Sequence, residues 1–228
     1  MKKKSILLLS LGAALLLLFA VFTVLVKVCD VKTVTYGGTA LTSAVGFGGI
    51  NLAVFGALGQ NGIWYTITEV LGYVAILLAA AFAVIGLCQW IKRKKLFSVD
   101  REILLLAVFY VAVMAFYVLF ELIVINYRPV LIDGELEASY PSSHSMLALS
   151  IFLSAPIALG KLIANRPLRI VSSALCGVLS ALTVAGRLLS GVHWLTDIVG
   201  AVLLSAALIL LYLAALSIWN GKASKTTA

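Results

Sequence analysis

The stretch ILLLAVFYVAVMAFYVLFELIVI, residues 103–125, holds one charged residue, Glu121, in 23 positions. A bilayer core about 30 Å thick is crossed by about 20 apolar residues in a helix. Lipid offers no hydrogen bonds to open backbone groups, so a single span has to be helical. Residues 103–125 therefore predict a transmembrane helix.

The rest of the chain repeats this pattern, and six spans are predicted at about 5–27, 65–91, 103–125, 143–160, 168–188 and 195–218. The chain is 63% hydrophobic and 11% charged, with a mean hydropathy of +1.14, which excludes an ordinary soluble domain. The first stretch resembles a signal peptide, but its apolar run is too long and no clear small-residue cleavage site follows. We therefore expect an all-α fold in which residues 1–228 form one integral-membrane domain, a six-helix transmembrane bundle.

The basic residues predict the orientation of these spans. If the N-terminus is cytoplasmic, the cytoplasmic segments hold 13 of the 17 Lys and Arg residues, which satisfies the positive-inside rule. The outer side then keeps Lys27, Lys32, Arg128 and Arg187. Both termini are expected in the cytoplasm of a multi-pass cell-membrane protein. Because the positive charge is grouped between apolar runs, the net charge of +8 does not indicate nucleic-acid binding.

Two outer loops follow from this topology. Residues 28–64 form a long, glycine-rich segment that is apolar but too broken to span. It is expected to lie at the membrane interface or to dip partly into the bilayer, and the sequence assigns it no function. Residues 126–142 form the second outer loop, which is expected to carry part of the site described next.

Five polar residues are predicted at the outer ends of spans three to six: Arg128, His144, Arg187, His193 and Asp197. Both histidines of the chain are among them. Ionisable groups at membrane depth are costly, so a functional site is the first hypothesis for such a group. The alternatives are a structural interfacial histidine and arginines that extend to the lipid headgroups.

These residue types suit phosphate chemistry. Guanidinium groups match phosphate oxygens, and Ser142 and Ser143 stand where an N-cap and first-turn N–H groups would attract an anion. His193 and Asp197 are four residues apart, so on a helix the carboxylate could reach one ring nitrogen and leave the other free to attack. His144 could then protonate the leaving oxygen as a general acid.

The residues resemble the type 2 phosphatidic acid phosphatase superfamily, the integral-membrane lipid phosphate phosphatases, over about residues 60–218. The matching positions are Arg128-Pro129, then Pro141, Ser142 and His144, then Arg187, His193 and Asp197. The resemblance implies a phosphohistidine on His193 that is oriented by Asp197, with His144 as the acid. It also implies that Arg128, Arg187 and Ser142 hold the phosphate, and it implies no metal or other cofactor.

Three positions depart from the family pattern: Ser143 replaces a glycine, Gly186 replaces a serine, and Glu121 stands where the family has a lysine. A carboxylate about 4 Å from a phosphate charge costs roughly 4 kcal/mol at an effective dielectric near 20. Glu121 could pair with Arg128 or Arg187, be protonated, or face a cationic or polyol part of the substrate. Glu69, a further carboxyl within a span, is expected to be structural and to pair with an outer basic residue.

The leading hypothesis is an extracytoplasmic lipid phosphatase that removes a terminal phosphate from a lipid phosphate or pyrophosphate. Its active site would lie at the outer ends of helices three to six. One alternative is a lipid phosphotransferase with the same site. Another is a non-catalytic protein that binds or transports anionic lipids, because Glu121 replaces the family lysine. The sequence names neither the lipid nor the oligomeric state.

Overall fold

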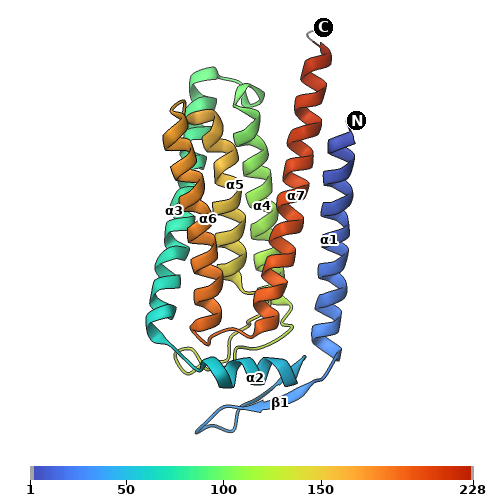
Figure 1. Cartoon of the computed structure of the whole chain (residues 1–228), viewed down its shortest axis with the longest axis vertical. Coiled ribbons are helices and arrows are strands. Elements are labelled where there is room, and N and C mark those ends of the chain that lie inside the picture. The colour runs from blue at the N-terminus through green and yellow to red at the C-terminus, as the bar shows by residue number, and fades with distance from the viewer. Residues whose placement is uncertain (1–2, 227–228) are drawn as a thin grey trace.

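Six long helices form an upright bundle in the computed structural model, which describes residues 3–226 (Figure 1). Their bounds are α1 Lys3–Val28, α3 Gly62–Arg93, α4 Arg101–Leu122, α5 Ser143–Leu162, α6 Arg166–Leu189 and α7 Leu195–Thr226. All six are long and apolar enough to cross a membrane, with the span of α7 ending at Gly221. The predicted six-span, all-α fold is thereby confirmed.

Helices α5 and α7 are the centre of the bundle. Half of the residues in their most apolar windows are buried, against 17–22% in the other four spans, whose side chains face the lipid. Serines allow α5 and α7 to approach closely: Ser205 Oγ lies 3.3 Å from the Met146 carbonyl oxygen and 3.5 Å from Ser150 Oγ. Small and hydroxylated residues commonly serve such contacts between membrane helices.

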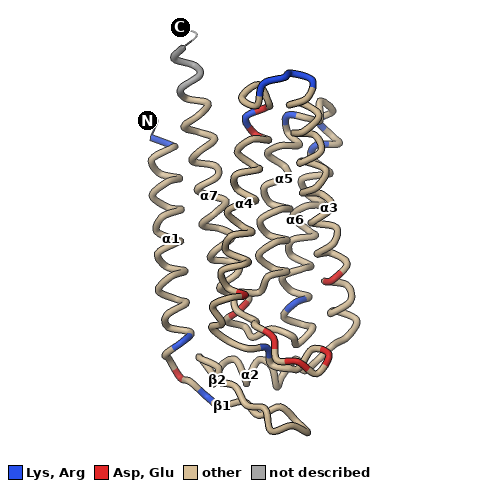
Figure 2. Tube along the Cα trace, turned by 180° about the vertical axis from the view of Figure 1, so that it is seen from behind, with Lys and Arg blue, Asp and Glu red and all other residues tan. Residues whose placement is uncertain are grey.

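The two ends of the bundle differ in charge (Figure 2). One end, here called the basic end, carries the α3–α4 and α5–α6 connections, with Lys92, Arg93, Lys94, Lys95, Lys161 and Arg166. The short helix η1, Leu96–Ser98, belongs to this end. The opposite end carries most of the acidic residues and, as shown below, both histidines; it is called the site end.

Helix α4 is shorter than predicted. The apolar residues Ile123, Val124 and Ile125 lie beyond its last residue, Leu122, although the sequence alone extended the span to 125. The ammonium group of Lys27 lies 3.4 Å and 3.3 Å from the carbonyl oxygens of Val124 and Ile125. Both carbonyls beyond the end of α4 therefore have a donor from α1.

The predicted loop 28–64 contains regular structure that was not predicted. Strands β1, Lys32–Thr35, and β2, Thr42–Val45, pair antiparallel with Lys32 opposite Val45. They lead into α2, Gly48–Leu58, which lies across the site end of the bundle (Figure 1). Asn61 then caps α3, since its side-chain oxygen accepts from the N–H groups of Ile63 and Trp64.

Candidate active site

Arg187 is the buried centre of the site end. It lies in the last turn of α6, and its side chain is 0% exposed. The preceding residue, Gly186, allows α6 to approach α3 at this level. A Cβ at position 186 would lie 2.6 Å from Thr68 Cγ2 and 2.9 Å from a ring carbon of Trp64. The serine of the family pattern therefore has no room here, which explains this departure.

The Arg187 guanidinium is held through its two terminal nitrogens, whereas its buried Nε has no hydrogen-bond partner within residues 3–226. Its Nη1 lies 2.9 Å from Glu69 Oε1 and 3.4 Å from Thr68 Oγ1, both on α3. Its Nη2 lies 3.3 Å from His193 Nε2, and the ring of Tyr65 stacks against the group at 5.4 Å. Glu69 thus pairs with a basic residue, as expected, and that residue is Arg187.

His193 lies before α7 and not on it. The turn between α6 and α7 places its Nδ1 3.5 Å from Asp197 Oδ2, while the same carboxylate oxygen accepts from the Trp194 N–H at 2.9 Å. The sequence interpretation put both residues on one helical face. In the structure they meet because Asp197, in the first turn of α7, folds its carboxylate back to the residues that precede the helix. The expected proximity holds, but its geometric reason was wrong.

The surroundings of His193 define its charge and tautomer. An arginine only donates hydrogen bonds, so the Nε2 atom that faces Arg187 has to carry a lone pair, and the proton belongs on Nδ1, toward Asp197. Burial, and then the positive charges of Arg187 and Arg128, lower the pKa of His193 well below its usual range. The imidazole is therefore neutral at neutral pH, with Nε2 free to act as a nucleophile.

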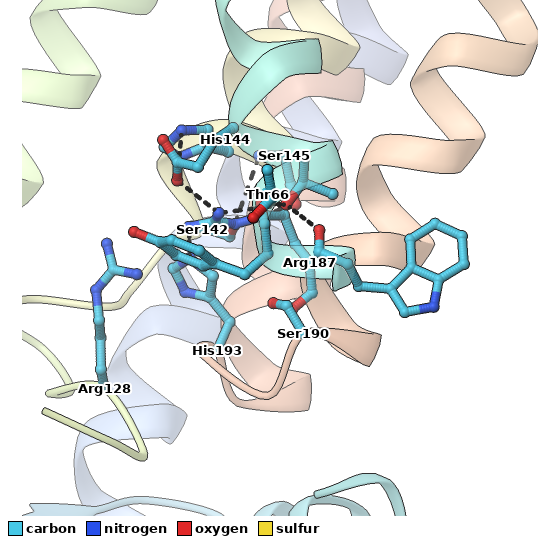
Figure 3. A network of polar contacts seen from close by, with 12 residues as sticks. Thr66, Arg128, Ser142, His144, Ser145, Arg187, Ser190 and His193 are labelled. Atoms are coloured by element: carbon cyan, nitrogen blue, oxygen red, sulfur yellow. Dashed lines mark hydrogen bonds and ion pairs between the residues drawn. The ribbon is translucent and has the colours of Figure 1, made fainter. Parts of the chain in front are cut away.

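His144 enters the site from the first turn of α5. Ser142 is the N-cap of this helix, and its buried hydroxyl accepts from the Ser145 N–H at 3.5 Å. His144 Nε2 lies 3.2 Å from Glu69 Oε1. The ring packs against Gly72 of α3, where a Cβ would lie 2.8 Å from His144 Cδ2. Figure 3 shows His144, Arg187 and His193 gathered in one small region, with Arg128 beside them.

Arg128 comes from the loop that follows α4. Its side chain is 11% exposed, and Nε lies 3.0 Å from Glu137 Oε2. The backbone N–H of Arg128 also donates to the Glu137 carbonyl at 3.0 Å. The buried hydroxyl of Tyr36, which follows β1, donates to the Arg128 carbonyl at 2.7 Å. The hairpin therefore fixes the backbone from which Arg128 reaches the site.

Helix α2 braces the other half of the site. Buried Asn51 donates to Thr196 Oγ1 at 2.9 Å and accepts from the Thr196 N–H at 3.2 Å, one residue from Asp197. Phe55 packs edge-on against Trp194, with ring centroids 5.7 Å apart. The segment 28–64, to which the sequence assigned no role, thus supports the loops that carry Arg128 and His193.

Glu121 does not form the ion pair that was considered for it. Arg187 pairs with Glu69 and Arg128 pairs with Glu137. Glu121 is exposed at the end of α4, and within residues 3–226 its carboxylate has no hydrogen bond or ion pair. It borders a small depression together with Ser143 and Tyr117. Its effect on the arginines is a longer-range Coulomb attraction, toward Arg128.

An apolar cavity of about 470 Å³ opens beside His144. Glu69, Ser143 and His144 form its polar end, and the remaining lining comes from α3, α4 and α5, including Tyr73, Ile76, Val113, Met114 and Ile151. Glu121 lies next to its mouth, because Tyr117 and Ser143 line both this cavity and the depression at Glu121. The arrangement can hold an anion at the histidines and an apolar chain between the helices.

Sequence reasoning found one of the two carboxylates that pair with the arginines and missed the other. The sequence predicts a structural pairing of Glu69 with an outer basic residue but gives no role to Glu137, and each forms the ion pair of one arginine. Glu69 carried a usable signal, since it is a carboxylate within a predicted span. Glu137 carried none, because it stands in a loop with two other acidic residues, Asp133 and Glu135.

Comparison with known proteins agrees with this geometry. Residues 123–220, which include Arg128, His144, Arg187, His193 and Asp197, match the family model of the PAP2 superfamily. These residues, here called the PAP2 segment, are similar to that superfamily. The PAP2 segment contains α5, α6 and α7 with the loops at their site ends, whereas Glu69 and the brace from α2 lie outside it.

The fold extends beyond the PAP2 segment. A crystal structure of a transmembrane PAP2-type phosphatidylglycerolphosphate phosphatase from Bacillus subtilis superimposes with a TM-score of 0.60. The match covers 92% of this chain and 96% of that chain, at 19% sequence identity. No curated protein matches the sequence. The structural likeness shows that the six-helix arrangement is shared.

Proposed function

We propose that the protein is a membrane lipid phosphatase that removes a terminal phosphate from a lipid phosphate or pyrophosphate through a phosphohistidine on His193. The observation that carries the proposal is the environment of His193. Nε2 faces the Arg187 guanidinium at 3.3 Å, while Nδ1 faces Asp197 at 3.5 Å. A phosphoryl group bound to Arg187 would therefore meet an unprotonated nitrogen of a correctly oriented imidazole.

In the first step, His193 Nε2 attacks phosphorus and the bond from phosphorus to the lipid oxygen breaks. His144, as the imidazolium, gives its Nε2 proton to the leaving oxygen and becomes a neutral imidazole, so the lipid departs as a neutral alcohol. In the second step, water attacks phosphorus, its proton passes to His144, and the P–N bond breaks to release inorganic phosphate. Arg187 and Arg128 stabilise the charge on the non-bridging oxygens, while Ser142 and Ser143 supply the start of α5.

The apolar cavity supports a lipid as the substrate. It ends at His144, the residue proposed to protonate the leaving oxygen. A lipid whose phosphate lies against Arg187 would place its first carbons beside His144 and its chain among the apolar residues of α3 and α4. A phosphoric or pyrophosphoric ester of a lipid alcohol has such a charged end and apolar chain. The phosphatidylglycerolphosphate in the name of the Bacillus subtilis protein is an ester of this class.

We further propose that the site end faces the outside of the cell and that both termini are cytoplasmic. The basic end carries the connections rich in Lys and Arg, as the positive-inside rule requires of the cytoplasmic side. A cysteine introduced at Glu135, on the exposed loop of the site end, should react in whole cells with a membrane-impermeant maleimide in a Cys29→Ala background. A cysteine introduced at Lys94, at the basic end, should react only after lysis.

The function is tested by phosphate release from purified protein in detergent micelles, with phosphatidic acid, phosphatidylglycerol phosphate and an isoprenyl pyrophosphate as substrates. His193→Ala and His144→Ala should each abolish release, and vanadate should inhibit the wild type. Glu135→Gln serves as a control, because this exposed side chain forms no hydrogen bond or ion pair within residues 3–226. Activity that survives His193→Ala would sink the phosphohistidine mechanism. Tight vanadate binding without turnover of any lipid would favour a binding protein.

A further inference from the structure

Within residues 3–226, Glu69 is the one acidic side chain that contacts both halves of the proposed reaction centre. A single carboxylate oxygen, Oε1, lies 2.9 Å from Arg187 Nη1 and 3.2 Å from His144 Nε2. Glu69 comes from α3, outside the segment that matches the PAP2 superfamily, and its side chain is 26% exposed, toward the apolar cavity. The mechanism above gives it no task.

The hydrogen-bonding capacities of this trio restrict the state of His144. An ionised carboxylate only accepts, and arginine only donates, so Oε1 accepts from Arg187. The contact with His144 is attractive only if Nε2 also carries a hydrogen. That hydrogen is the one that a general acid has to present, and His144 lines the cavity where the leaving oxygen would lie.

From this we infer that Glu69 is a positioning residue for His144: it keeps a proton on Nε2 and aims that proton at the leaving oxygen. The inference rests on the proposed function. Packing supports it, because Gly72, less than one helical turn from Glu69, leaves room for the imidazole edge. The ring is therefore held from two sides by α3, by contact at Gly72 and by the carboxylate at Glu69.

The positive charges around His144 explain why a carboxylate is useful beside it. The positive charges of Arg187 on α6 and Arg128 on the loop after α4 act on the ring, and His193 lies beyond Arg187. Glu69 is the carboxylate in direct contact that offsets them. During the first step the Nε2–H of the His144 imidazolium turns from Glu69 to the leaving oxygen, which takes the proton as the P–O bond breaks. When water is deprotonated in the second step, the restored Nε2–H returns to Glu69.

The experiment compares two leaving groups in Glu69→Gln. A lipid alkoxide needs a proton to depart, whereas the nitrophenolate of p-nitrophenyl phosphate does not. On phosphatidic acid in mixed micelles we expect kcat to fall about 10²-fold, the lower range of general acid catalysis. On p-nitrophenyl phosphate the initial burst of nitrophenolate reports the first step alone, without the water attack in which His144 takes a proton, and we expect its rate to change by less than about threefold. His144→Ala should show the same contrast, and Glu69→Gln added to it should cause little further loss.

A role limited to holding Arg187 predicts a different result, because both substrates would then lose activity equally. Vanadate binding, measured as a rise in thermal unfolding temperature, separates the two without any turnover. Removing a carboxylate that competes for Arg187 should leave vanadate binding as tight or tighter. Weaker binding, or equal losses on both substrates, overturns the inference.

The matched control is Glu135→Gln, the same substitution on an exposed loop of the same end, which should match the wild type on both substrates and with vanadate. A failure of the proposed function looks different from a failure of this inference. In that case the wild type releases no phosphate from any substrate, or His193→Ala retains activity. If His193→Ala is inactive and Glu69→Gln treats both leaving groups alike, only the role of Glu69 is lost.

Discussion

Two arginine–carboxylate pairs, one at each end of the bundle, have almost the same length and opposite surroundings. Arg187 Nη1 and Glu69 Oε1 are 2.9 Å apart at the site end, with side chains 0% and 26% exposed. Arg93 Nη1 and Asp100 Oδ1 are 2.8 Å apart at the basic end, with side chains 42% and 36% exposed. The distance is the same, so the environment decides what each pair does.

Losing one partner of the buried pair should destabilise the protein, whereas losing one partner of the exposed pair should not. Water cannot solvate Arg187 if its partner is lost, so each member of the pair is required by the other. Water and salt can replace either partner of the exposed pair, and such pairs contribute little to stability. A phosphate that enters the site end meets a guanidinium already held in place. To bind it, Arg187 has to exchange its contact with Glu69 for one with the phosphate.

The largest effect is expected from Arg187→Gln. Loss of this charge removes a proposed phosphate ligand and leaves Glu69 without its strongest partner. We expect phosphate release to fall by about 10³-fold and the free energy of unfolding to fall by about 3–5 kcal/mol. Phosphate release and thermal unfolding in detergent, followed by tryptophan fluorescence, measure the two effects. A variant as stable as the wild type would show that burial of this pair carries no stability requirement.

Arg128→Gln is expected to have the next largest effect, and it tests an intermediate case. Arg128 is 11% exposed but its partner Glu137 is 45% exposed, so activity should fall by about 10²-fold with little loss of stability. The charge of Arg128 also helps to lower the pKa of His193. Removing it raises the pKa of His193. On acidification the imidazole therefore takes up its proton at a higher pH than in the wild type.

The acid limb of kcat/KM, which reports groups of the free enzyme, measures this change. In the wild type it should lie below pH 6.5, the usual pKa of histidine. In Arg128→Gln it should move upward. Lys32→Gln, which removes a positive charge from β1 at the same end, should leave it unchanged. An acid limb that does not move in Arg128→Gln would mean that burial alone controls His193.

Gly186→Ser restores the family residue and probes the packing that buries Arg187. Because a Cβ at 186 would meet Thr68 and Trp64 closer than 3.0 Å, α6 has to move away from α3. We expect a loss of about 1–3 kcal/mol, the usual cost of overpacking. Gly177→Ser is the matched control on the same helix, since a Cβ there has nothing within 4 Å. Equal unfolding temperatures for the two variants would contradict the close contact.

The smallest effect is expected from Arg93→Gln at the basic end. We expect a change of roughly 0–1 kcal/mol that shrinks further as salt is added. The hydrogen bond from Arg93 lowers the pKa of Asp100, so the stability that this pair gives is present above the ordinary pKa of an aspartate and is lost as the pH falls. Thermal unfolding at neutral pH and near pH 3 compares the two conditions. A loss as large as that of Arg187→Gln would remove the contrast between the two ends.

The sequence by itself determined the six spans and the set of residues at one end. The cost of placing a residue in lipid accumulates locally along the chain, so the apolar run 143–160 predicts a helix without any knowledge of its neighbours. The same logic placed Arg128, His144, Arg187, His193 and Asp197 at one level of the membrane. It failed at 123–125, where the helix has ended at Leu122 and Lys27 of α1 contacts the carbonyls of Val124 and Ile125.

Only the tertiary structure decided which groups pair. Glu69, Arg187 and His144 come from three helices, and their contacts depend on how each helix is rotated and how closely it packs, as at Gly72 and Gly186. Those contacts are long-range and cooperative, so no local pattern encodes them. For the same reason the sequence drew attention to Glu121, which is exposed, whereas the structure drew it to Glu69, which joins the arginine to the histidine.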